Sequence, residues 1–149
     1  MSQDFYLGNP NLKKVGTEIQ FTKDQIQEYL RCKEDPVYFA MTYIKIISLD
    51  EGIVPFKMWD FQQQLIESFH EHRFNIAKLP RQTGKSTTCV SYLLHYILFN
   101  DNVNVGILAN KLSTARDLLG RLQLAYEQLP LWLQQGIVVY NKGSMELEN

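Results

Sequence analysis

The 149-residue sequence predicts an α/β fold in which helices cover both faces of a parallel sheet. Three observations lead to this prediction. Residues 74–79 form a short apolar run typical of a buried strand, and a glycine-containing loop follows it. Residues 86–99 have the length and apolar content of a packed helix, and residues 103–109 form a second apolar run. Strands that alternate with helices in this way are typical of parallel sheets.

Ahead of these elements, the sequence predicts an extended arm and two helices. Residues 1–20 are polar and show no clear hydrophobic period, so we expect them to be extended. Thr22 and Gln25 have the spacing of a capping box, which predicts a helix that runs to about residue 33. Asp35 followed by Pro36 is typical of the N-cap and first residue of a second helix.

The other elements follow from the same kinds of signal. A turn is expected at residues 50–52, where Asp, Glu and Gly cluster. A β-hairpin is expected near the C-terminus, because Asn, Lys and Gly at 141–143 separate two strand-like segments. In chain order, the remaining predictions are an extended piece at 53–58, a helix at about 60–72, a turn at 100–102, a helix from Ser113 that Pro130 closes, and strands at 137–140 and 144–148.

Composition and charge limit the classes of function. The net charge is −1, so the chain lacks a strong positive field for nucleic acid, and DNA contact would need a local patch or a partner domain. Cys32 and Cys89 are too few for a disulfide framework or a zinc site, which favours a reduced, intracellular protein. No apolar run approaches the roughly 18–20 residues that cross a bilayer, and the N-terminus lacks signal-peptide features, so we expect no membrane partner.

Residues 79–87 are Leu-Pro-Arg-Gln-Thr-Gly-Lys-Ser-Thr and end in the phosphate-binding half of a P-loop. Gly84 allows a close turn in which successive N–H groups point at an anion. Lys85 brings a positive charge to the β- and γ-phosphates, and the Ser86 hydroxyl is suited to ligate Mg²⁺. A helix that begins here adds its dipole and unpaired N–H groups. Leu79 replaces the first glycine of the full pattern, so the interpretation depends on the strand–loop–helix setting.

A sheet of this class usually has about five strands, whereas only two are predicted before the hairpin. Either the fold is a miniature of this class, or the sequence holds only part of it. We predict the second, an incomplete P-loop NTPase sheet of the RecA-like (ASCE) type with an N-terminal helical subdomain. We expect residues 1–55 to form the arm and a lid-like helical subdomain, and residues 56–149 to form a partial P-loop ATPase core. We also expect the chain to be the N-terminal piece of a larger protein.

Several stretches of the sequence carry a resemblance to one known family. They are Phe61-Gln62, residues 81–86, residues 105–111, Leu129-Pro130 and residues 136–147. Together they make nearly the whole chain similar to the ATPase domain of the large terminase subunit of tailed bacteriophages, most strongly of contractile-tailed myophages. Leu79 fits this family, because its loop variant has Arg-Gln-x-Gly-Lys followed by Ser or Thr.

The resemblance implies a motor that uses ATP and Mg²⁺ to pump double-stranded DNA into an empty procapsid. It implies that Lys85 contacts the β- and γ-phosphates, Arg81 stabilises the γ-phosphate and Ser86 holds Mg²⁺, while Gln62 reads adenine. The implied partners are the portal of the procapsid, the small terminase subunit and further copies in a ring, in the host cytoplasm. The nucleotide-binding residues implied are Gln62, Pro80, Arg81, Gln82, Thr83, Gly84, Lys85, Ser86 and Thr87.

The residues by themselves leave other interpretations open. Gln62 begins a run of three glutamines that suits a solvated helix face, and Arg81 suits a surface loop. A superfamily 2 helicase or translocase also has a glutamine ahead of its P-loop, and a non-catalytic nucleotide-binding or docking module is a third class. After Lys85 no acidic pair follows an apolar strand. We therefore expect the catalytic Glu and the nuclease carboxylates to lie outside this sequence, and the chain alone to be a weak or inactive ATPase.

Overall fold

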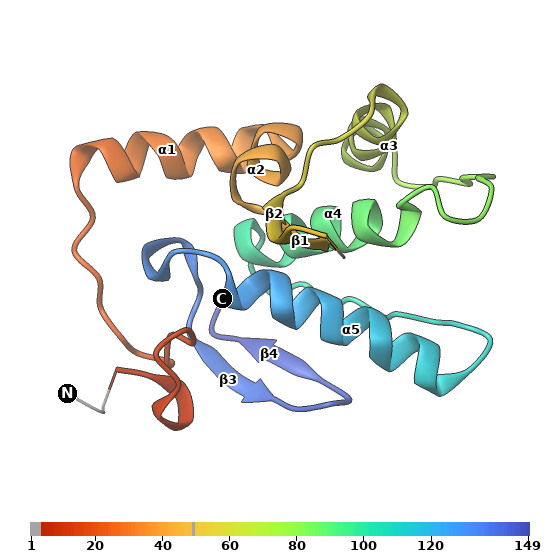
Figure 1. The fold of residues 1–149 in the computed structure, drawn as a ribbon. Coiled ribbons are helices and arrows are strands. Elements are labelled where there is room, and N and C mark those ends of the chain that lie inside the picture. The colour runs from red at the N-terminus through yellow and green to blue at the C-terminus, as the bar shows by residue number, and fades with distance from the viewer. Residues whose placement is uncertain (1–3, 49) are drawn as a thin grey trace.

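The computed structural model of the chain describes residues 4–48 and 50–149. Within these ranges it is a mixed α/β structure with five α-helices and two antiparallel two-stranded sheets (Figure 1). Its elements are the 3-10 turn η1 (Tyr6–Gly8), α1 (Lys23–Glu34), α2 (Pro36–Tyr43), β1 (Lys45–Ser48), β2 (Gly52–Pro55), α3 (Asp60–Glu71), α4 (Lys85–Phe99), α5 (Leu112–Glu127), the 3-10 turn η2 (Leu131–Leu133), β3 (Ile137–Tyr140) and β4 (Met145–Leu147).

The predicted start signals of the first two helices are confirmed. Thr22 Oγ1 accepts from Gln25 N at 3.2 Å, and Gln25 Oε1 accepts from Thr22 N at 3.0 Å, which completes the capping box of α1. Asp35 Oδ1 accepts from Tyr38 N at 2.8 Å and caps α2. Side chains at these caps satisfy N–H groups that have no partner inside a helix, so each helix begins where such a residue stands.

Helix α4 lies at the centre of the core. It packs against α2, α3 and α5, and Figure 1 shows it between α3 on one side and α5 on the other. Its apolar residues Val90, Leu94, Leu98 and Phe99 are buried. The buried side chains that join them in one hydrophobic cluster are Leu12, Cys32, Phe39, Ala40, Ile44, Phe56, Met58, Ile66, Leu122, Ala125, Tyr126, Leu129, Leu133 and Ile137.

The N-terminal arm is attached to the C-terminal hairpin. Lys14 forms an isolated parallel bridge with Ile137 of β3. The Glu148 carboxylate accepts from Gly136 N at 2.7 Å and Gly16 N at 2.9 Å, and it forms an ion pair with Lys13 at 3.6 Å. These hydrogen bonds lower the pKa of Glu148 against the opposing effect of partial burial. The arm around residues 13–16 and the C-terminal hairpin therefore belong to one packed unit.

Both sheets are local hairpins. The predicted C-terminal hairpin is confirmed, because β3 and β4 pair antiparallel and the Asn141 side chain accepts from Gly143 N and Ser144 N in the turn. The turn at 50–52 and the extended piece after it belong to a second hairpin, in which β2 pairs with β1. The strand β1 was not predicted from the sequence.

The prediction of two parallel strands is wrong. Residues 74–80 and 103–109 contain no strand, and the two sheets found in the described ranges are antiparallel. Phe74 is 83% exposed and Leu108 is 91% exposed, so these apolar side chains lie outside the core. A buried strand needs neighbours that pair its N–H and C=O groups, and neither segment pairs with another in the described part of the chain. Apolar strand-like composition was therefore not sufficient to form a strand here.

His95 is a buried titratable group in this core. It is 2% exposed, and its Nε2 lies 2.9 Å from the Cys32 carbonyl oxygen, so Nε2 carries the hydrogen and donates. The other ring nitrogen, Nδ1, has no hydrogen-bond partner. Burial disfavours the charged imidazolium and lowers the pKa of His95 from 6.5 to about 4, although the bond to Cys32 acts in the opposite direction.

We predict that stability falls as the pH is lowered from 7 towards 4. The unfolded chain protonates His95 near pH 6.5, whereas the folded chain does so only near pH 4, so acid favours the unfolded state in this window. One pKa unit corresponds to about 1.4 kcal/mol, so the full effect of the shift is roughly 3–4 kcal/mol. Urea unfolding at half-unit pH steps measures it.

The control compares two substitutions. His95→Phe removes the titrating group and should flatten the pH dependence between 6.5 and 4.5, whatever its absolute stability. Gln64→Met changes an exposed side chain that does not titrate and should leave the dependence unchanged. Parallel pH curves for the wild type and His95→Phe would show that His95 does not cause the effect.

Candidate functional site

Residues 80–84 form a tight loop that leads into α4. Gln82 and Gly84 both have positive φ, of 62° and 70°, and Gly84 is the left-handed N-cap of the helix. Thr83 Oγ1 donates to Pro80 O at 3.1 Å across the loop. Thr88 N donates to Gly84 O at 3.0 Å and makes the first helical hydrogen bond. The segment is therefore a loop followed by a helix, and the strand expected before it is missing.

Lys85 reaches back over this loop. Its Nζ donates to Leu79 O at 3.5 Å and to Pro80 O at 3.3 Å. Lys85 is exposed and is the first residue of α4. The ammonium group therefore lies beside the loop backbone, and a bound anion would compete with two carbonyl oxygens for its donors. The arrangement places a positive charge and the N-terminal end of a 15-residue helix at one point.

The other predicted loop residues differ in their exposure. Arg81 and Gln82 are exposed on the loop, whereas Ser86 and Thr87 are half-buried in the first turn of α4. N–H groups in the first turn of a helix have no partner within the helix. Backbone N–H groups and an ammonium group suit the phosphates of a polyphosphate, and a hydroxyl oxygen suits its Mg²⁺ ion. These residues come together because they are neighbours in the sequence.

Gln62 is the one predicted site residue that reaches the loop from a distant part of the chain. It lies in the first turn of α3, is 4% exposed, and its Nε2 donates to Thr83 O at 3.1 Å. Its Oε1 accepts from Trp59 N at 3.0 Å. The amide therefore lies against the loop backbone. The expectation that Gln62 reads adenine stays a prediction.

Two features of the loop favour glycine at position 84. Its φ of 70° lies in the left-handed region, which disfavours side chains. In addition, a Cβ atom on Gly84 would lie 2.6 Å from Nε2 of Gln62, far inside van der Waals contact. A side chain at residue 84 would therefore displace the Gln62 amide from its hydrogen-bonded position against the loop. The P-loop pattern in the sequence indicates the positive φ at Gly84. No feature of the sequence indicates the contact with Gln62.

Two carboxylates near the C-terminus, those of Glu127 and Glu148, have structural partners. Glu148 holds the N–H groups of Gly16 and Gly136, and Glu127 accepts from the Tyr140 hydroxyl. Among the residues that the structure describes, no group of three or more His, Cys, Asp or Glu side chains is arranged to hold a metal ion. The Ser86 hydroxyl remains the candidate Mg²⁺ ligand.

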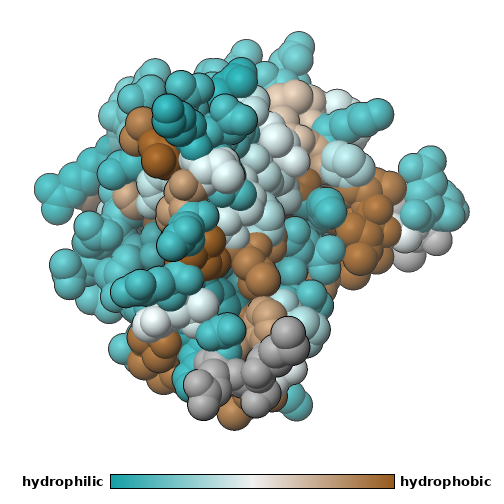
Figure 2. Space-filling model, turned by 90° about the vertical axis from the view of Figure 1, so that its left-hand side faces the viewer, coloured by the Kyte–Doolittle hydropathy of each residue, from teal (hydrophilic) through white to brown (hydrophobic). Residues whose placement is uncertain are grey.

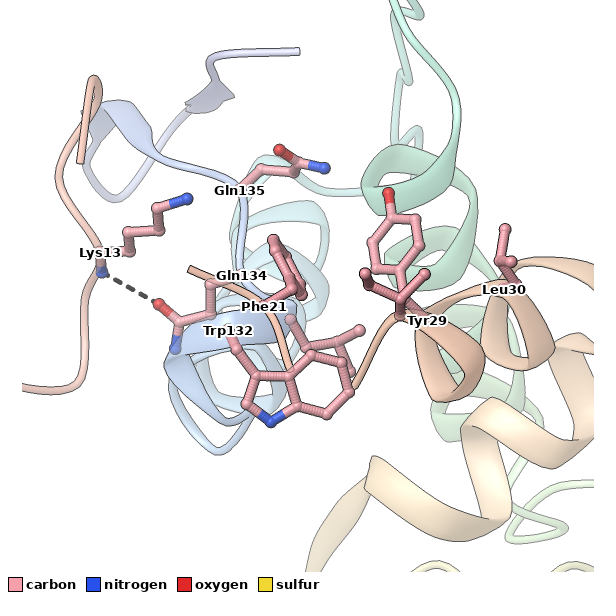
Figure 3. Close-up of a pocket in the computed structure, with 9 residues that line it drawn as sticks. Lys13, Phe21, Tyr29, Leu30, Trp132, Gln134 and Gln135 are labelled. Atoms are coloured by element: carbon pink, nitrogen blue, oxygen red, sulfur yellow. Dashed lines mark hydrogen bonds between the residues drawn. The ribbon is translucent and has the colours of Figure 1, made fainter. Parts of the chain in front are cut away.

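A separate apolar pocket lies between α1 and η2. It has a volume of about 300 Å³ and is open to solvent. Phe21, Tyr29 and Trp132 contribute aromatic walls, and Lys13 N donates to Gln134 Oε1 at 3.0 Å at one end (Figure 3). Figure 2 shows hydrophobic patches on an otherwise mostly hydrophilic face. None of the residues that line this pocket belongs to the loop at 80–87.

The chain matches no known protein-family model. Within residues 4–48 and 50–149, no helix has the length and apolar character needed to cross a membrane.

We predict opposite effects of two glycine substitutions on stability. Gly84→Ala introduces a side chain at positive φ and against Gln62, so it should lower the free energy of unfolding by about 1–2 kcal/mol. Gly120→Ala is the control, because this glycine lies within α5 with open space around it. Alanine there should raise stability by roughly 0.5–1 kcal/mol through helix propensity. Equal urea midpoints for the two variants would contradict the strained-loop interpretation.

Proposed function

We propose that this chain is the ATP-binding part of a DNA-packaging motor of the terminase large-subunit type, with ATP and Mg²⁺ as cofactors. One observation carries the proposal. The segment 80–85 forms a glycine loop at the start of a buried helix, and the Lys85 ammonium group lies against the backbone of that loop. In this proposal Lys85 and Arg81 are the catalytic residues, and residues 80–87 with Gln62 form the nucleotide site.

Each side chain has a defined task in the proposed site. Lys85 exchanges its two carbonyl partners for phosphate oxygens, and the N–H groups of the loop and first helical turn hold the rest of the polyphosphate. Arg81 is exposed next to these groups, and its planar donor fork suits a phosphoryl group that gains charge. The Ser86 hydroxyl would ligate Mg²⁺, which neutralises charge that develops during phosphoryl transfer.

We also propose that the complete protein builds a P-loop sheet of which this chain holds part. The segments 74–79 and 103–109 have strand-like composition and exposed apolar side chains. Such segments become strands when neighbouring strands pair both of their edges. The acidic pair that hydrolysis needs would then come from residues outside this sequence. Double-stranded DNA, the portal of the procapsid, the small terminase subunit and further copies in a ring are the proposed partners, in the host cytoplasm.

A titration with a fluorescent ATP analogue and Mg²⁺ tests the binding proposal. Lys85→Ala should weaken binding by about tenfold or more, since a charge-assisted contact is worth roughly 1.5–3 kcal/mol. Lys142→Ala is the matched control, because it removes the same charge from the turn between β3 and β4. Binding that is absent in the wild type, or equal in the wild type and Lys85→Ala, would refute the nucleotide site and favour a docking module.

We predict that the 149-residue chain alone hydrolyses ATP very slowly. A positioned base or water-orienting residue is needed for fast phosphoryl transfer, and the proposed site lacks one. Turnover should be on the order of 10⁻³ s⁻¹ or less, against an order of 1–100 s⁻¹ for complete phosphoryl-transfer enzymes. A phosphate-release assay measures it. Turnover by this chain at the rate of a complete motor would show that its own residues suffice for catalysis.

A further inference from the structure

The orientation of the Gln62 amide is determined by its two partners. Trp59 N is a donor, so the atom that faces it at 3.0 Å must be the carbonyl oxygen Oε1. Thr83 O is an acceptor, so the atom that faces it at 3.1 Å must be the amide nitrogen Nε2. If the amide were flipped, Nε2 would face the donor Trp59 N, and Oε1 would face the acceptor Thr83 O. Gln62 therefore links the first turn of α3 to the loop in one defined direction.

The helix that carries Gln62 is itself held in the core. Ile66, one turn further along α3, is fully buried. The Tyr92 hydroxyl of α4 donates to Phe69 O of α3 at 3.0 Å. Because α3 and α4 are joined in this way, Gln62 keeps a defined position relative to the N-terminus of α4. The loop is thus held from two sides, by its covalent connection to α4 and by the side chain from α3.

The hydrogen bond from Gln62 controls the peptide unit between Thr83 and Gly84. In a planar trans peptide the C=O and N–H bonds point in opposite directions. Because the Thr83 carbonyl points at Gln62, the Gly84 N–H points away from it. Glycine adopts positive and negative φ with similar ease, so Gly84 imposes little preference of its own on this peptide. An external hydrogen bond is therefore needed to select one orientation.

We propose that Gln62 is a positioning residue of the phosphate-binding loop, which locks the Thr83–Gly84 peptide so that the loop N–H groups are preorganised for a polyphosphate. This inference rests on the proposed function, because it requires the loop to bind phosphates. It assigns Gln62 a role that is independent of the base. With 4% exposure and both ends of its amide bonded to protein, Gln62 acts through the loop backbone.

The test uses inorganic tripolyphosphate, which has phosphates but no base. Its affinity with Mg²⁺ is measured by calorimetry, beside ATP and GTP, for the wild type, Gln62→Met and Gln64→Met. Gln62→Met keeps the length of the side chain and loses both hydrogen bonds. It should weaken tripolyphosphate and ATP by the same factor, about fivefold to tenfold, the effect of one or two hydrogen bonds. Its preference for ATP over GTP should not change. Gln64→Met, at an exposed position of the same helix, should behave as the wild type.

A second variant covers the case that Gln62→Met does not fold. Gln62→Glu keeps an oxygen for Trp59 N but places a carboxylate oxygen against Thr83 O. Its affinity for tripolyphosphate should therefore fall at least as much as that of Gln62→Met. Amide hydrogen exchange adds a readout that a general packing role would not give. In folded variants, exchange should accelerate at Thr88, whose N–H donates to Gly84 O at the start of α4, and stay unchanged at Leu94, in the buried centre of α4.

The outcomes separate this inference from the proposed function. A wild type that binds neither ATP nor tripolyphosphate overturns both. A wild type that binds tripolyphosphate, with a Gln62→Met or Gln62→Glu variant of equal affinity, overturns the positioning role alone. If the Gln62→Met substitution spares tripolyphosphate but removes the preference for ATP over GTP, then Gln62 reads the base and the positioning role is wrong. Accelerated exchange at Leu94 also contradicts it, because the effect would then be loss of packing.

Discussion

The structure depends on the burial of α4 against three other helices. Its apolar residues pack against α2, α3 and α5 and make one core with side chains from most of the chain. The same helix begins at the glycine loop, so the position of the loop is set by packing one to three turns further along. A helix that is held by its neighbours gives its N-terminus a rigid base. The candidate site is therefore built on a helix whose core-facing residues are buried, although the loop itself is largely exposed.

Backbone hydrogen bonding explains why the described structure lacks the expected sheet. Helices pair their backbone groups internally, and a hairpin pairs two strands that are close in sequence. The two sheets found among the described residues are both of the second kind. A parallel strand instead needs partners that are distant in sequence. Residues 74–79 and 103–109 have no such partners among the described residues, so their apolar side chains stay outside the core.

The candidate site combines local and long-range features. Lys85, Ser86 and the loop glycine are adjacent in the sequence, and their geometry follows from the start of a helix after a turn. Gln62 belongs to another helix, and its contact with Thr83 arises only because α3 packs on α4. The side chains proposed to bind phosphate and Mg²⁺ thus come from one short segment, whereas the contact between Gln62 and Thr83 forms only when the chain folds. This contact also places Nε2 of Gln62 where a side chain on residue 84 would collide with it.

Local signals in the sequence determined the starts of α1 and α2, the loop before α4 and the C-terminal hairpin. Thr22, Asp35 and Asn141 act through hydrogen bonds to residues two or three positions away, so their effect is readable without the fold. Only the tertiary structure decided that Gln62 faces the loop and that residues 103–109 stay unpaired. It also decided that the arm pairs with β3. These outcomes depend on groups that lie far apart in the chain, and a hydrophobic pattern does not specify which partner meets which.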